Sequence, residues 1–140
     1  MKHPHTAHTR ALNEARSALL RLHKQLLDAE QLRYERENGR ITSGGALLQL
    51  VIHDPAFAWL RPLSGLVVQI DEEIEGDEPM TDERARTMIG EIRSMLIADE
   101  EGEVFQKNYH RALQDAPEIV IAHREVTRLL DTAPSGGNAK

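Results

Sequence analysis

Apolar residues recur along most of the chain in steps of three and four positions, which is the spacing of one face of an α-helix. Between residues 9 and 37 this stripe consists of Leu12, Ala15, Leu19, Leu22, Leu26 and Ala29. Gly39 follows Asn38 and can close a helix by adopting the left-handed conformation. The pattern predicts a first helix of about 43 Å over residues 9–37, a length that favours an elongated bundle.

A second helical segment is predicted to begin after residue 43, where Thr42 or Ser43 can act as the N-cap. The residues that follow are apolar on nearly every side of the helix: Leu47, Leu48, Leu50, Val51 and Ile52. Because a helix that is apolar all round is normally buried, we expect this segment to lie deep in the molecule.

Two prolines, Pro55 and Pro62, predict bends in the path that continues from this segment to residue 76. Phe57 and the only tryptophan, Trp59, lie between the two prolines. We expect the bends to wrap these large side chains around neighbouring helices, so that they fill the interior. The alternative is that the indole N–H of Trp59 lines a ligand pocket.

The remaining periodic segments predict a third helix from residue 81 and a fourth from residue 103 that Pro117 interrupts. The expected fold is all-α, a four-helix up-and-down bundle with proline-kinked second and fourth helices. If the kinked segments are separate helices, the count rises to five or six. We expect a flexible N-terminus over residues 1–8, one helical domain over residues 9–132, and a disordered tail over residues 133–140, which is rich in Gly and Ser.

Composition narrows the functional classes. The chain has 140 residues and a net charge of −6, which argues against nucleic acid as a partner because phosphate binding needs clustered Lys and Arg. It has no cysteine, so disulfides and thiolate chemistry are excluded. No apolar run is long enough to cross a membrane, and residues 1–10 lack the apolar region of a secretory signal. We therefore expect a cytoplasmic protein without a membrane partner.

Histidines are the main candidates for metal or ligand binding. His3, His5 and His8 could offer three imidazoles to one metal ion, although a tail with weak, adventitious affinity is the alternative. Neither Glu-x-x-His nor His-x-x-x-His occurs at the histidines within the predicted helices.

A pocket near Trp59 is the candidate small-molecule site, with His53, His110 and His123 as further ligand-binding residues. His123 lies among apolar residues, where a hydrogen-bonded core histidine is the simpler interpretation. If His53 and His123 approached each other, they would form a pH-sensitive pair. We expect no cofactor.

No catalytic constellation is evident. Ser64-Gly65 lacks the preceding glycine and strand of a nucleophile elbow, and Gly44-Gly45 lacks the lysine of a phosphate-binding loop. An enzyme whose site the sequence does not reveal is the third of three interpretations; we expect a non-enzymatic protein.

Two stretches, DPAFAWLRPLSGLVVQIDE (residues 54–72) and LQDAPEIVIAHREVTRLL (residues 113–130), resemble a group of small uncharacterised bacterial proteins. The Trp-Leu-Arg-Pro-Leu core is the most specific part of the resemblance. It implies a bacterial, intracellular, all-α protein, and it carries no activity, cofactor or catalytic residue.

The first functional interpretation is an interaction or assembly protein that self-associates. Leu20, Leu27 and Tyr34 form a second stripe on the first helix, which gives that helix more apolar surface than one bundle face needs. We expect this stripe to be the interface of a homodimer, the commonest symmetric assembly, whereas the sequence does not identify a partner of another kind. The small-molecule or metal-binding bundle with a pocket near Trp59, His53 and His123 is the alternative.

Overall fold

The computed structural model of the protein describes residues 6–133, which fold into seven α-helices and contain no strand. The helices are α1 (Ala7–Asn38), α2 (Gly44–His53), α3 (Pro55–Ala58), α4 (Arg61–Glu75), α5 (Asp82–Met95), α6 (Val104–Asp115) and α7 (Pro117–Leu130). The predicted all-α fold is confirmed. Residues 1–5 and 134–140, which make up most of the predicted flexible ends, lie outside the described residues.

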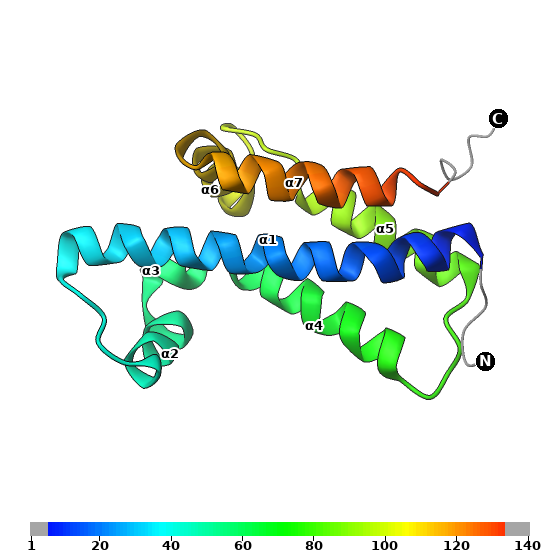
Figure 1. Cartoon of the computed structure of the whole chain (residues 1–140), viewed down its shortest axis with the longest axis horizontal. Coiled ribbons are helices and arrows are strands. Elements are labelled where there is room, and N and C mark those ends of the chain that lie inside the picture. Colours follow the sequence, from blue (N-terminus) through cyan, green and yellow to red (C-terminus); the bar gives the residue numbers. More distant parts are fainter. Residues whose placement is uncertain (1–5, 134–140) are drawn as a thin grey trace.

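The long helix α1 is the axis along which four of the other helices pack (Figure 1). Its 32 residues correspond to about 48 Å. It begins at Ala7, two residues before the predicted start, because the Thr6 hydroxyl caps it by accepting a hydrogen bond from the Thr9 backbone N–H at 3.1 Å. α7 runs antiparallel along one side of α1, while α3, α4 and α5 also pack against it (Figure 1).

Pro55, Pro62 and Pro117 lie in the first turns of new helices instead of bending continuous ones. Pro55 and Pro117 are the first residues of α3 and α7, and Pro62 lies in the first turn of α4. The residues before Pro55 and Pro117, Asp54 and Ala116, have extended backbones, so the chain changes direction before each new helix starts. The predicted four-helix up-and-down bundle with two kinked helices is therefore not confirmed; its second path is three helices and its fourth is two.

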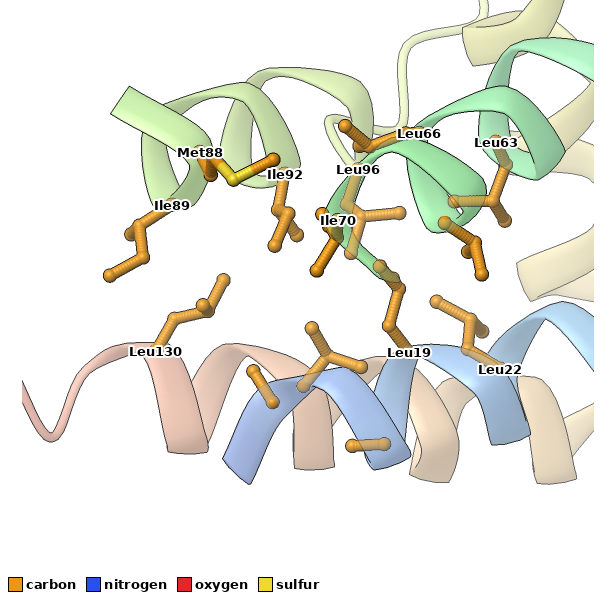
Figure 2. Close-up of a cluster of buried hydrophobic side chains, with 14 of the residues drawn as sticks. Leu19, Leu22, Leu63, Leu66, Ile70, Met88, Ile89, Ile92, Leu96 and Leu130 are labelled. Atoms are coloured by element: carbon orange, nitrogen blue, oxygen red, sulfur yellow. The ribbon is translucent and has the colours of Figure 1, made fainter. Parts of the chain in front are cut away.

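The core is one cluster of buried side chains between α1, α4, α5 and α7 (Figure 2). Leu19 and Leu22 come from the predicted stripe of α1, and the view shows them facing α4 and α5. Phe57 and Trp59 are buried, with 1% and 8% of their surface exposed. The expectation that these aromatic side chains fill the interior is confirmed.

The position of α2 contradicts the expectation that this apolar segment lies deep. None of its residues is buried, and the side chains of Leu48 and Ile52 are 56% and 47% exposed. α2 packs mainly against the short helix α3 and lies apart from the other helices in Figure 1. The turn at Asp54 and the guanidinium of Arg61, which donates to the carbonyl of Ile52, hold the C-terminal end of α2 in this position.

The acidic residues at the end of α4 pair with arginines of two neighbouring helices. Arg16 of α1 donates to Asp71 at 2.7 Å and lies 3.1 Å from a carboxylate oxygen of Glu75. Arg84 of α5 donates to Glu73 at 2.8 Å. These partly exposed pairs fix the position of α4 relative to its neighbours. Within residues 6–133, no helix combines the length and hydropathy that spanning a membrane requires.

Candidate functional site

The most unusual feature of the described residues is a buried carboxylate, Glu30, near the middle of the C-terminal half of α1. Only 4% of Glu30 is exposed, and Thr9 is the only other buried polar residue within residues 6–133. Three groups donate to it: the Trp59 indole Nε1 at 2.9 Å, an Arg111 nitrogen at 3.1 Å and an Arg33 nitrogen at 3.3 Å. Because glutamate is rarely buried, this cluster is the first candidate for a functional site.

Trp59 links the polar cluster to the aromatic core. It follows α3, whose start is fixed by the Asp54 side chain accepting a hydrogen bond from the Ala56 N–H at 2.8 Å. The indole ring lies 5.5 Å from the ring of Phe105, and the Arg111 guanidinium carbon lies 5.7 Å from the indole centroid. The distance of the guanidinium from the indole is within the range of a cation–π contact.

Arg111 on α6 hydrogen-bonds to two residues of the cluster, but one of its guanidinium nitrogens has no hydrogen-bond partner. One terminal nitrogen donates to the Asn108 side-chain oxygen at 2.9 Å, and the other donates to Glu30. Its buried Nε has no hydrogen-bond partner in the described part of the chain; the nearest carboxylate, Asp115, is 4.0 Å away. Since a buried donor without a partner is costly, this N–H is available for an additional acceptor.

Two hollows flank this cluster, and both are lined by Glu30, Arg33, Trp59 and Arg111. The corner hollow, about 420 Å³, lies between α1 and the corner where α6 meets α7. The α3 hollow, about 470 Å³, lies between the end of α1, the start of α3 and α6. These volumes are in the range of small-molecule sites. The arrangement can therefore bind a polar ligand.

Of the predicted ligand-binding residues, the structure places only Trp59 at these hollows. His53 is the exposed last residue of α2, and the His110 Nε2 lies 3.3 Å from the Gln114 amide nitrogen on the surface of α6. Figure 1 shows α2 and α7, which carry His53 and His123, on opposite sides of α1. The structure does not bring these histidines together.

His123 makes a specific contact inside the helical domain. Its Nδ1 lies 2.6 Å from the hydroxyl oxygen of Tyr109, a fully buried residue. Burial raises the pKa of Tyr109 and lowers the pKa of His123. The hydroxyl therefore stays protonated and donates a hydrogen bond to the neutral imidazole. This is the hydrogen-bonded core histidine that the sequence suggested.

A serine–histidine pair occurs where the sequence gave no reason to expect one. The His23 Nε2 on α1 and the Ser64 hydroxyl on α4 are 2.6 Å apart, and burial lowers the pKa of His23. A base that activates a serine is normally oriented by a third group. In residues 6–133 no carboxylate hydrogen-bonds to His23, and the contact links α1 to α4.

Of the three N-terminal histidines proposed as metal ligands, only His8 lies within the described residues. His3 and His5 lie outside the described residues. The His8 Nδ1 lies 2.9 Å from a carboxylate oxygen of Asp82. The pKa of Asp82 is lowered mainly by a hydrogen bond from Thr6 and to a smaller extent by His8. Within the described range, no group of three or more His, Asp or Glu side chains is arranged to hold a metal ion.

The predicted interface stripe on α1 is not one exposed strip. Leu20 is 42% exposed, but Leu27 is partly buried against the core. The ring of Tyr34 lies 5.8 Å from that of Phe57. A repeat of seven residues drifts by about 20° around a straight helix, so the stripe turns from solvent toward α3 as it proceeds along α1.

Glu30, Arg33 and Arg111 were not among the predicted site residues, although the sequence carries one signal for Glu30. The buried stripe of α1 proceeds from Leu22 to Leu26 in a step of four, and the next step of four reaches Glu30. A charged residue on a buried stripe needs buried partners, so this position pointed to a polar cluster. The distant partner on α6 could not be found from spacing.

Comparisons of the chain with models of protein families, with curated proteins and with solved structures found no match.

Proposed function

We propose that this protein is a non-enzymatic interaction module that self-associates through α2. The observation that carries the proposal is that α2 is apolar on most sides and yet has no buried residue. Leu48 and Ile52 lie one helical turn apart on the same face, and both are about half exposed. Exposed apolar surface of this kind is typical of an interface.

The absence of charge on α2 favours a second copy of the same chain as the partner. No Asp, Glu, Lys or Arg occurs from Ile41 to His53, although the whole chain carries a net charge of −6. In a two-fold dimer a patch faces its own copy, so any net charge near the axis would repel itself. α2 avoids this repulsion, whereas the acidic surface elsewhere opposes association.

The size of α2 limits the interface area that it can bury. A stable dimer buries about 800 Å² on each subunit, more than one face of a ten-residue helix provides. In this proposal α2 forms the centre of the interface, and its flanking residues supply the rim. The protein is then a cytoplasmic bacterial homodimer, with no nucleic acid or membrane as partner.

The test is sedimentation velocity of the purified chain over a wide concentration range. We expect a concentration-dependent dimer that Leu48→Glu converts to a monomer, because a dimer with this substitution would bury two opposed carboxylates. The matched control is Ile121→Glu on α7, where the side chain is 69% exposed; it should leave the dimer intact. A chain that stays monomeric up to about millimolar concentration, or a Leu48→Glu variant that still dimerises, contradicts the proposal.

A second candidate function, small-molecule binding beside Trp59, is supported by a separate observation. A buried Glu30 with two arginines and an indole N–H lies between two hollows of about 420 and 470 Å³. Arg111 lines both hollows, and its buried Nε has no hydrogen-bond partner in residues 6–133, so an acceptor group of a ligand can pair with it. This proposal requires no metal and no catalytic residue.

A further inference from the structure

A broad groove between α4 and α5 carries almost no charge. Its volume is about 890 Å³, and its lining covers about two turns of each helix. Glu91 is the only charged residue in this lining, whereas Pro62, Leu66 and Met95 are apolar, in a chain of which 29% is charged. The side chain of Val68 on α4 is 53% exposed and adds to the uncharged surface of this helix. An exposed surface with so little charge is typical of an interface.

Two glycines in the α4–α5 groove are not required by packing within the chain. Gly65 and Gly90 lie inside α4 and α5, both are exposed, and neither has a positive φ. A Cβ atom at either position would meet no other part of residues 6–133 within 4 Å. Because glycine is a poorer helix former than alanine, each glycine weakens its helix without a return inside one copy. The close approach of a partner to this groove accounts for both.

The exposed helix α2 matches the α4–α5 groove in length and in its lack of charge. Its ten residues correspond to about 15 Å, and the groove extends about 12 Å along α5 from Thr87 to Met95. α2 contains no Asp, Glu, Lys or Arg, so it brings no charge to a groove that could not pair one. Leu48 and Ile52 are spaced as the anchors of a helix that binds in a groove. A groove also covers more sides of α2 than a second α2 helix would.

We propose that α2 of one copy of this chain binds in the α4–α5 groove of a second copy. Figure 1 shows α2 and α4 on the same side of α1, so a two-fold axis on that side sets each α2 over the groove of the other copy. The contact then occurs twice, and each copy contributes both a helix and a groove to the area of about 800 Å² that a stable dimer buries on each subunit. The inference rests on the proposed self-association and names the surface that receives α2.

Cross-linking between differently substituted copies tests which surfaces meet. The chain has no cysteine, so Gln49→Cys on α2 and Ser94→Cys in the groove each provide one reactive thiol. The two variants are mixed in equal amounts, treated with a short bismaleimide and analysed by mass spectrometry. We expect a cross-linked dimer with one copy of each variant, and little product when Ser17→Cys, an exposed position of α1, replaces Ser94→Cys. If Gln49→Cys alone cross-links as readily as the mixture, α2 faces α2 and the inference is wrong.

Substitutions that fill the groove test its role without disturbing the core. Gly65→Gln and Gly90→Gln each place a larger side chain where one copy has open space, and glutamine is the better helix former. We expect each variant to raise the dimer dissociation constant about tenfold or more in sedimentation velocity, because an oversized side chain disrupts a packed contact. The matched control is Ser17→Gln, which lies outside the groove and should leave the dissociation constant unchanged.

The outcomes separate this inference from the proposed self-association. If Leu48→Glu abolishes the dimer while both glycine variants dimerise like the unsubstituted chain, α2 mediates self-association through another surface, and only the inference is wrong. If the unsubstituted chain is monomeric at every concentration, both are wrong. The melting temperature of each glycine variant, measured at a concentration where it is monomeric, should be no lower than that of the unsubstituted chain, which excludes unfolding as the cause of a lost dimer.

Discussion

Replacing Glu30 by alanine perturbs the one charged residue that the helical core encloses. The substitution removes the acceptor for three donors, at 2.9 Å from the Trp59 indole, 3.1 Å from Arg111 and 3.3 Å from Arg33. The indole N–H is buried and has no alternative partner in the described residues, which costs about 1–3 kcal/mol. The two arginines are 32% and 41% exposed, so solvent reduces the worth of each pair to about 1 kcal/mol or less.

The sum predicts that Glu30→Ala lowers the free energy of unfolding by about 3 kcal/mol, the low end of the range for breaking a buried ion pair. Glu30→Gln keeps an acceptor for the indole N–H and loses only the charge, so it should cost about half as much. Urea unfolding can be followed by tryptophan fluorescence, because Trp59 is the only tryptophan and reports directly on this cluster.

The control is Glu37→Ala, an exposed glutamate on the same helix, which should change the free energy of unfolding by less than about 0.5 kcal/mol. Both substitutions replace a glutamate of α1 by alanine, so their difference reports mainly on the buried contacts of Glu30. If Glu30→Ala costs no more than Glu37→Ala, the cluster does not stabilise the fold and the reasoning about its burial is wrong.

Three further predictions concern stability. Burial lowers the pKa of His23 and His123 from the ordinary value of 6.5, so the unfolded chain binds protons more readily than the folded one. The free energy of unfolding should therefore be lower at pH 5 than at pH 7.5. If the His23→Gln variant shows the same difference between the two pH values, His23 is not its source. Phe57→Ala should cost about 3–5 kcal/mol in urea unfolding because Phe57 is 1% exposed, and a cost below about 1 kcal/mol would contradict its place in the core. Gly39→Ala should lower the melting temperature, since the φ of Gly39 is 91° and an alanine there is strained by about 1 kcal/mol; an unchanged melting temperature would show that the turn relaxes.

Several features of this protein follow from local sequence rules alone. The repeat of apolar residues on α1 specifies both a helix and the face that it buries, because a helix returns to the same side every three to four residues. Pro55, Pro62 and Pro117 mark where a continuous helix is interrupted, since a missing N–H and a fixed φ act on the nearest neighbours only. The burial of Phe57 and Trp59 follows from their size and apolar character.

Only the tertiary structure decided how the helices pack and which side chains meet. The proline patterns left open whether the chain bends or starts a new helix, and the extended backbones of Asp54 and Ala116 determine that it starts anew. The pairing of Glu30 with Arg111 joins positions 81 residues apart, a separation that no periodic pattern encodes. α2 shows the same limit from the opposite direction. Its apolar composition predicted a buried position, but the direction in which the turn at Asp54 sends the helix leaves its side chains without burial.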